Sequence, residues 1–206
     1  MAAASAYLQT IHWLWRPTYL VPIQPSSTCV VCLSKANPFV SKNTCSGIRL
    51  ANLDDAPVIL SIFQHCDPFA IKGRRQQHIN LIDVMDWIES ITGTHPMLVL
   101  EEQGKVIAWC SLEPFYGLPA FDAASEISLY VHPEEQGKGV GTQLIQYLET
   151  QRTELGFTHL VAYIYASNIE SQSFFKRHGF EQWGLLPNIA QSEQVKEDVL
   201  ILGREF

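Results

Sequence analysis

The chain has 206 residues, enough for one domain with a tail, and 47% of them are hydrophobic, which suffices for a sizeable core. No Asp or Glu precedes Asp54, so the remainder carries all 21 acids against 10 of the 14 Lys and Arg, a balance of −11. Such an acidic surface repels phosphate backbones, which argues against nucleic acid as a partner and suits a cationic substrate such as an amine.

The first 45 residues form a poorly patterned N-terminal extension that contains three of the five cysteines. Cys29 and Cys32 have the C-x-x-C spacing of redox and zinc sites, but no second cysteine pair or histidine pair follows them. An odd number of irregularly spaced cysteines does not indicate a secreted disulfide framework. We therefore expect ordinary thiols, no metal site and a reducing compartment.

The most apolar early segment, Ile11–Ile23, is interrupted by Arg16, Pro17 and Pro22 and is too short to span a membrane. It also lacks the basic start and small-residue cleavage pattern of a secretory signal. We expect a cytoplasmic protein without a membrane partner. Organellar import through the acid-free N-terminus stays open beside two favoured explanations, a disordered extension and a misassigned start codon.

Regular patterning begins after this extension, and residues 46–206 are predicted to form one domain. Ile48–Leu50 predicts a short strand. Asp54 or Asp55 is predicted to cap the helix that follows, with Pro57 in its first turn.

The next segment, Cys66–Asn80, is polar and irregular, which predicts a surface loop or a short helix. A second helix is predicted over Leu81–Ile91, with apolar side chains at helical spacing at Ile82, Met85 and Ile88.

The second half of the chain alternates strands and helices. Strands are predicted at Met97–Leu100, Val106–Leu112, Ser125–Val131, Thr158–Tyr165 and Val199–Leu202, and helices at Val140–Leu155, closed by Gly156, and Ile169–His178. The resulting order, β-α-α-β-β-β-α-β-α-β, indicates a mixed α/β layer fold.

A glycine-rich segment, Gln136–Gly141, lies between a predicted strand and a predicted helix. Glycines there let the backbone turn tightly and present N–H groups at the positive end of the helix dipole, a site suited to a pyrophosphate. A Walker A loop is excluded because Lys138 is followed by Gly139, and the G-x-G-x-G spacing differs from the G-x-G-x-x-G of dinucleotide sites.

This segment, reached through Tyr-Val-His-Pro, resembles the acetyl-CoA-binding motif of the GNAT superfamily of N-acetyltransferases. Asn168, Ser171 and Gly179–Phe180 match the second half of that fold, and the whole of Gly47–Phe206 can be aligned with it. EISLYVHPEEQGKGVG and GFEQWGLLP are most similar to the phosphinothricin acetyltransferase group, whose members acetylate small amino-acid-like molecules. The resemblance implies an α/β GNAT fold with a mixed, mostly antiparallel central sheet flanked by helices.

The resemblance also implies roles for particular residues. Glu126 matches the general base at the start of the central strand, and Asn168 is expected to bond the pantetheine of acetyl-CoA. The other expected contacts with acetyl-CoA are Leu129, Tyr130 and Val131 along the acetyl-pantetheine arm, and Gln136, Gly137, Lys138, Gly139, Val140, Gly141 and Thr142 around the pyrophosphate.

Strand alternation supports Glu126 independently, because Glu126, Ser128 and Tyr130 share one face of the predicted strand. An acid on a buried central strand is costly unless it has a role or a partner. The alternative is an ordinary carboxylate at the exposed end of the strand.

One position departs from the family pattern. Many GNAT enzymes have Tyr, and the phosphinothricin group His, seven residues after the Asn, but Phe175 stands there and cannot donate a proton. The nearby His178 is expected to face solvent, so either solvent or another group must protonate the CoA thiolate.

Three functions remain in view. The first is acetylation of a small-molecule amine, the second a non-catalytic acyl-CoA-binding or regulatory module, and the third acetylation of a protein N-terminus or lysine.

The loops Glu113–Ala124 and Cys66–Asn80 are expected to shape the acceptor site. Within the latter, Arg74 and Arg75 are interpreted as a solvated surface pair rather than carboxylate ligands. A homodimer is compatible with the sequence.

Overall fold

The computed structural model describes residues 47–69, 78–192 and 195–206. The predicted extension over residues 1–45, including Cys29 and Cys32, lies outside the described residues, as do Arg74 and Arg75.

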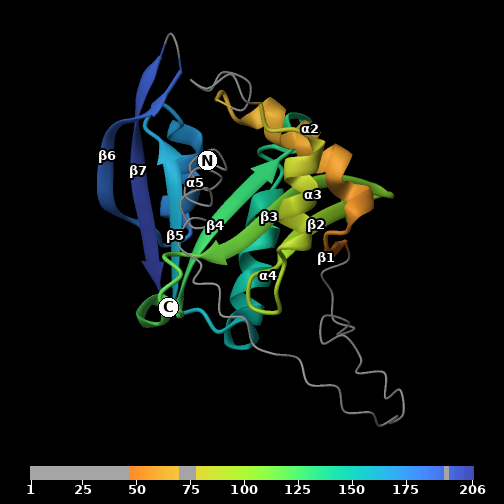
Figure 1. Ribbon diagram of the computed structural model, residues 1–206, viewed down its shortest axis with the longest axis horizontal. Coiled ribbons are helices and arrows are strands. Elements are labelled where there is room, and N and C mark those ends of the chain that lie inside the picture. The colour runs from red at the N-terminus through yellow and green to blue at the C-terminus, as the bar shows by residue number, and fades with distance from the viewer. Residues whose placement is uncertain (1–46, 70–77, 193–194) are drawn as a thin grey trace, which may run out of the picture.

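The described residues form a seven-stranded sheet with the order β1-β2-β3-β4-β5-β7-β6. Its strands are β1 (Ile48–Leu50), β2 (Met97–Glu102), β3 (Lys105–Pro114), β4 (Ala124–Val131), β5 (His159–Tyr165), β6 (Glu181–Gln191) and β7 (Lys196–Glu205). Neighbouring strands are antiparallel except for β4 and β5, which are parallel and lie at the centre of the sheet (Figure 1).

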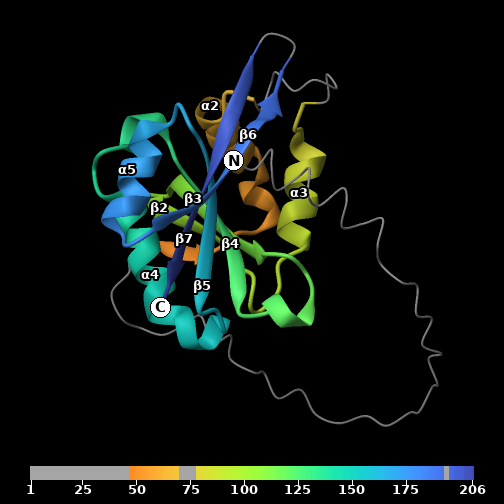
Figure 2. The same ribbon diagram turned by 90° about the vertical axis from the view of Figure 1, so that its left-hand side faces the viewer.

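Helices cover both faces of this sheet. They are α2 (Ala56–Cys66), α3 (Leu81–Glu89), α4 (Val140–Leu155) and α5 (Ile169–Arg177), with short 3₁₀ turns η1 (Leu53–Asp55), η2 (Pro119–Phe121) and η3 (Pro133–Glu135). Figure 2 shows α4 and α5 on one side of the sheet and α3 on the other, with α2 beside α3 in Figure 1. Within the described ranges, no helix is both long and apolar enough to cross a membrane.

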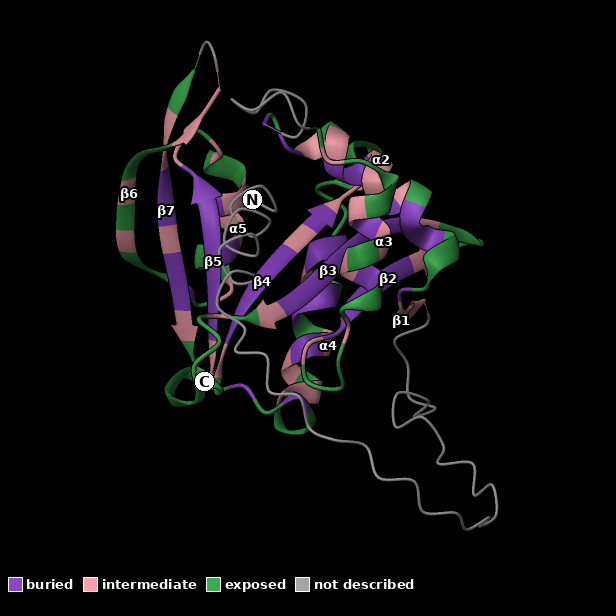
Figure 3. Ribbon diagram, in the orientation of Figure 1, coloured by how far each residue is buried: buried purple, intermediate pink, exposed green. Residues whose placement is uncertain are grey.

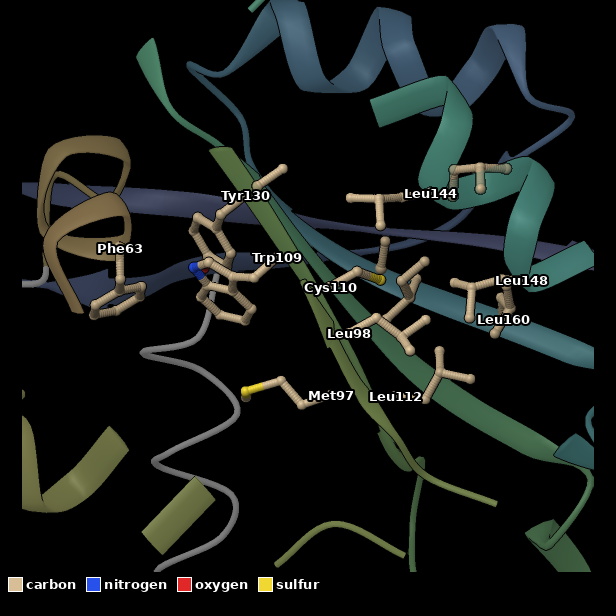
Figure 4. Close-up of a cluster of buried hydrophobic side chains, with 14 of the residues drawn as sticks. Phe63, Met97, Leu98, Trp109, Cys110, Leu112, Tyr130, Leu144, Leu148 and Leu160 are labelled. Carbon is tan, nitrogen blue, oxygen red and sulfur yellow. The ribbon is translucent and has the colours of Figure 1, made fainter. Parts of the chain in front are cut away.

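The core consists of two apolar layers, one on each face of the central strands, which are buried along most of their length (Figure 3). On the α2 side, the Tyr130 ring stacks on Trp109 at 4.5 Å and meets Phe63 edge-on at 5.4 Å. Figure 4 shows these three rings on one side of the strands, and Cys110, Leu144, Leu148 and Leu160 on the other. The sheet is therefore held between the two helical layers by side chains from both of its faces.

The longest helix follows the prediction from its sequence. It spans Val140–Leu155, and Gly156 ends it in the left-handed conformation, with φ of +78°. The predicted stripe at Val140, Leu144, Leu148 and Leu155 is buried against the sheet, so the helical periodicity was sufficient to define this element.

The structure of α2 and α3 differs from the sequence-based prediction in two details. The side chain that caps the first turn is Asn52, at the start of η1, whereas the Asp55 carboxylate accepts hydrogen bonds from Arg49 and the Asn52 N–H. In α3, the predicted positions Met85 and Ile88 pack against the core, but Ile82 is 69% exposed and Val84, which was not predicted, is buried. Ile82 lies in the first turn of α3, where a side chain has few neighbours to cover it. The spacing of apolar residues in the sequence does not reveal this exposure.

The edge strand β6 was missing from the predicted order, which contained six strands instead of seven. It contains Pro187, which cannot donate to a ladder, and its pairing with β7 shifts register between Gln182 and Gly184 and again between Leu186 and Ala190. These irregularities remove the simple alternation by which a strand is recognised in a sequence.

Candidate active site

Strands β4 and β5 separate immediately after Glu126. Their parallel pairing covers three residue pairs and ends at Glu126 with Val161, although β4 continues to Val131 and β5 to Tyr165. In Figure 1 the two strands lie together near the C-terminus and diverge toward the other end of the sheet. Glu126 therefore lies at the point of divergence.

Backbone groups of β4 beyond this point are directed toward the side of β5. Phe115 N–H donates to the Ala124 carbonyl and His132 N–H to the Ile107 carbonyl, so the even-numbered residues of β4 bond to β3. Because direction alternates along an antiparallel strand, the N–H groups of Leu129 and Val131 point the other way. The pairing with β5 has ended there, so these donors face away from β3 without a β5 residue opposite them.

Glu126 is buried, with 5% of its surface exposed. It is paired in register with Glu113 of β3, and directly opposite residues share one face of a sheet. Burial first, and then the neighbouring Glu113 carboxylate, raise the pKa of Glu126 to about 8. The alternative of an exposed strand-end carboxylate is thus wrong, and the residue has the environment of a base that titrates near neutral pH.

As predicted, Glu126, Ser128 and Tyr130 share one face of β4. Ser128 pairs with Ser111 and Tyr130 with Trp109, in line with the Glu126–Glu113 pair, so all three β4 side chains lie on the α2 side. Tyr163 of β5 lies two residues after Val161, the partner of Glu126, and therefore on the same face of the sheet. Burial, followed by the charge of Glu126, raises the pKa of Tyr163 to about 12.

The glycine-rich segment adopts the conformation that its sequence predicts. Gly137 and Gly139 have φ of +73° and +85°, a region that favours glycine. A Cβ atom added at either position would meet no atom within 4 Å, so both glycines border open space. Gly139 also begins α4 without any side-chain cap, which leaves the first N–H groups of the helix available to an anion.

The third glycine of this segment has a different function. Gly141 is buried, and a Cβ there would lie 3.0 Å from Cζ of Phe174 and 3.5 Å from a methyl carbon of Leu129. It is required for close packing of α4 against α5 and β4, not for a left-handed turn. Val140 points into the core, so its side chain is not available to a ligand.

The remaining side chains of the turn are engaged locally. Gln136 Nε2 donates to the Val131 carbonyl at 3.1 Å, which ties the turn to the end of β4. The Cys66 thiol, from the end of α2, donates to the same carbonyl at 3.3 Å. Lys138 is exposed and forms an ion pair with Glu135 at 2.9 Å. These contacts hold the Gln136 and Lys138 side chains at the turn, where both residues are exposed.

Asn168 has a local role that the sequence-based prediction did not include. Its side-chain oxygen accepts a hydrogen bond from the Ser171 N–H at 3.0 Å and caps α5. The side-chain NH₂ group is a separate donor and remains compatible with the predicted pantetheine contact.

Phe175 lies in the core, 2% exposed, with its ring 4.9 Å from Phe180 and 5.2 Å from Phe174. His178, expected to face solvent, is half-buried, and its Nδ1 is 2.8 Å from the Phe174 carbonyl oxygen. Phe175 therefore has no proton to offer, and the His178 ring is held at the end of α5 through its Nδ1.

Two residues near Glu126 and the turn were not identified from the sequence. The pairing of Glu113 with Glu126 depends on strand register, and the contact of Cys66 with Val131 joins residues 65 positions apart. The sequence signal for Glu113 was no more than an acid near the end of an apolar strand. Among the described residues, no cluster of three or more His, Cys, Asp or Glu could hold a metal ion.

Comparisons with known proteins agree with this geometry. The acetyltransferase (GNAT) family model matches residues 59–180. The "Putative phosphinothricin acetyltransferase YwnH" of Bacillus subtilis is 36% identical over 77% of this chain and 98% of its own length. The L-amino acid N-acyltransferase MnaT of Escherichia coli is 29% identical over 69% of this chain and 83% of its own.

A solved structure extends the similarity to three dimensions. The phosphinothricin acetyltransferase from Sinorhizobium meliloti, in complex with AcCoA, superposes with a TM-score of 0.68 at 25% identity over 77% of this chain and 87% of that one. The expected fold, a mixed and mostly antiparallel sheet flanked by helices, is confirmed. The family model covers more than half of the chain, and the chain spans most of the length of these relatives. The protein belongs to the acetyltransferase (GNAT) family and is an acyltransferase.

Proposed function

We propose that the protein transfers an acetyl group from acetyl-CoA to the amine of a small amino-acid-like substrate, with Glu126 as general base and residues 46–206 as the catalytic domain. The observation that carries the proposal is the buried Glu126 at the point where β4 and β5 separate. The names of YwnH, MnaT and the Sinorhizobium meliloti enzyme support the substrate class, since phosphinothricin is itself amino-acid-like.

The fit to acetyl-CoA rests on the backbone. Gly137 and Gly139 leave open space where side chains would otherwise stand, and the uncapped N-terminus of α4 presents N–H groups to the pyrophosphate. Leu129 and Val131 direct N–H groups to the side on which the acetyl-pantetheine arm is proposed to lie. Acetyl-CoA supplies the thioester carbonyl that the amine attacks.

In the proposed reaction, Glu126 accepts a proton from the substrate ammonium, directly or through a water molecule. The neutral nitrogen then forms a bond to the carbonyl carbon as the C–S bond breaks, and the acylated nitrogen releases its second proton to water. An N–H group in Leu129–Val131 stabilises the negative charge that develops on the carbonyl oxygen, a contribution of about 3 kcal/mol. The thiolate takes a proton from water or from a group other than Phe175.

A thiol-release assay tests this proposal. The full chain is incubated with acetyl-CoA and a panel of amino acids, methionine sulfone, methionine sulfoximine, phosphinothricin, polyamines and peptides. We expect turnover on an amino acid that disappears in Glu126→Gln while CoA binding persists. Tight CoA binding without turnover on any amine would favour the non-catalytic module, and turnover confined to peptides would favour the protein acetyltransferase.

Replacing Asn168 by Ala separates its two roles. Loss of the α5 cap is expected to lower stability by about 1 kcal/mol, measured by thermal unfolding. Loss of one hydrogen bond to the pantetheine is expected to raise the KM for acetyl-CoA roughly 3- to 10-fold, measured by steady-state kinetics.

Asn80→Ala is the matched control. Asn80 caps α3 through a bond from the Ile82 N–H at 2.8 Å, as Asn168 caps α5. It should show the same loss of stability with an unchanged KM. An equal KM in both variants would contradict a cofactor contact by Asn168.

A further inference from the structure

Trp183 occupies an irregular position in the edge strand β6. Gln182 pairs with Leu202 and Gly184 with Ile201, so three consecutive residues of β6 face two of β7 and Trp183 is the additional one. Such a β-bulge redirects the side chain of the extra residue and is common beside active sites. The direction in which Trp183 points is therefore set by the bulge and not by regular strand alternation.

The indole of Trp183 lies flat on Gly203 of β7. A Cβ at Gly203 would be 2.0 Å from Cε3 of the ring, so the ring occupies the space that any other residue at this position would need. The His159 ring of β5 lies 6.2 Å away at 60°, which shows that the indole extends toward β5. A glycine and a bulge together fix the ring in this place.

Sheet register relates this ring to Glu126. Gly203 pairs with Val161, and Val161 pairs with Glu126, so these three positions are in line across β7, β5 and β4 and share one face. Two strand spacings separate Gly203 from Glu126, roughly 10 Å. The indole covers Gly203 and extends toward His159, which lies two residues before Val161 on β5. The ring is therefore on the same face of the sheet as the Glu126 side chain.

Half of the indole surface remains open, since Trp183 is 49% exposed while its neighbours Val161 and Gly203 are buried. A large aromatic surface that is held in place and left accessible is suited to contact an apolar group. A substrate whose amine lies at Glu126 reaches it only with a side chain of several carbon atoms.

We propose that Trp183 is a specificity-determining residue whose indole supports the side chain of the acceptor, so that amines with a large apolar side chain are preferred. This inference rests on the proposed function, and it names the substrate class of the same site.

The test compares kcat/KM of the full chain for phenylalanine, leucine and methionine with that for alanine and glycine. In Trp183→Ala we expect a decrease of about 10-fold or more for the large acceptors and a change within about twofold for the small ones. Trp183→Phe should retain most of the preference. The KM for acetyl-CoA should not change in either variant.

Two further variants control for structural effects. Leu185→Ala removes an exposed apolar side chain, 48% exposed, from the same strand but at a position paired with Leu200 on the opposite face, and it should leave the ratio unchanged. Gly203→Ala should displace the indole and lower the ratio without removing Trp183. Thermal unfolding verifies that each variant is folded at the assay temperature.

The outcomes separate the two proposals. Turnover by the wild-type chain with the same ratio of large to small acceptors in Trp183→Ala would overturn the specificity role alone. An equal loss on all acceptors would also overturn it. Absence of turnover by the wild-type chain on every amine would overturn the proposed function and this inference with it.

Discussion

Glu126→Gln is expected to lower kcat by about 10²- to 10⁴-fold, because Gln cannot accept the proton that the substrate ammonium must lose. The affinity for acetyl-CoA should stay within about twofold, since the proposed pyrophosphate contacts lie in the separate turn at Gly137–Gly139. Steady-state kinetics measure kcat, and calorimetric titration with CoA measures the affinity. An unchanged kcat would exclude Glu126 as the base.

The pH dependence of the wild-type chain follows from the pKa of Glu126, which burial and Glu113 raise to about 8. A base acts when it is deprotonated, so kcat/KM should increase with pH and level off above about pH 8. Glu113→Gln removes the neighbouring charge and should move this limb to lower pH. The exposed Glu102 is the control, and Glu102→Gln should leave the profile unchanged.

The same carboxylate should affect stability with the opposite sign. Its pKa is higher in the folded chain than the ordinary value of 4.5, so folding favours the protonated form. Stability from this group is fully present below about pH 4.5 and is lost as pH rises through about 8. Glu126→Gln is therefore expected to be more stable than the wild type at pH 8, by an amount on the order of a few kcal/mol. Thermal melts across this pH range check the prediction.

Gly139→Val is expected to weaken CoA binding by about 10- to 100-fold. Val is strained at φ of +85°, and its side chain would fill the open space beside the turn. Loss of even one charge-assisted hydrogen bond to the pyrophosphate, about 1.5–3 kcal/mol, accounts for such a change. Equilibrium titration with CoA measures it.

Gly156→Val provides the matched control at the other end of the same helix. Gly156 has φ of +78° and also borders open space, but it caps the C-terminus of α4. Both variants should lose about 1–3 kcal/mol of stability through the same backbone strain. Only Gly139→Val should lose CoA affinity, and equal losses would contradict the placement of the pyrophosphate at this turn.

Local patterns were sufficient for several features of this protein. The stripe from Val140 to Leu155 and the capping Gly156 defined α4, since helix periodicity and termini depend on residues a few positions apart. The spacing of Gly137, Gly139 and Gly141 was enough by itself to exclude two other phosphate-binding motifs. Strand alternation likewise assigned Glu126 to the face of Ser128 and Tyr130, as the register with β3 bears out.

Features that depend on distant residues were decided only by the tertiary structure. The burial of Glu126 and its position opposite Glu113 follow from the register of β3 with β4, and the separation of β4 from β5 follows from where their pairing ends. The seventh strand and the orientation of Trp183 over Gly203 depend on bulges between β6 and β7. Pairing between strands joins residues far apart in the chain, so a local pattern cannot specify it. The sequence by itself therefore determined the family and the Gln136–Gly141 turn, whereas the surroundings of Glu126 and Trp183 were determined by long-range packing.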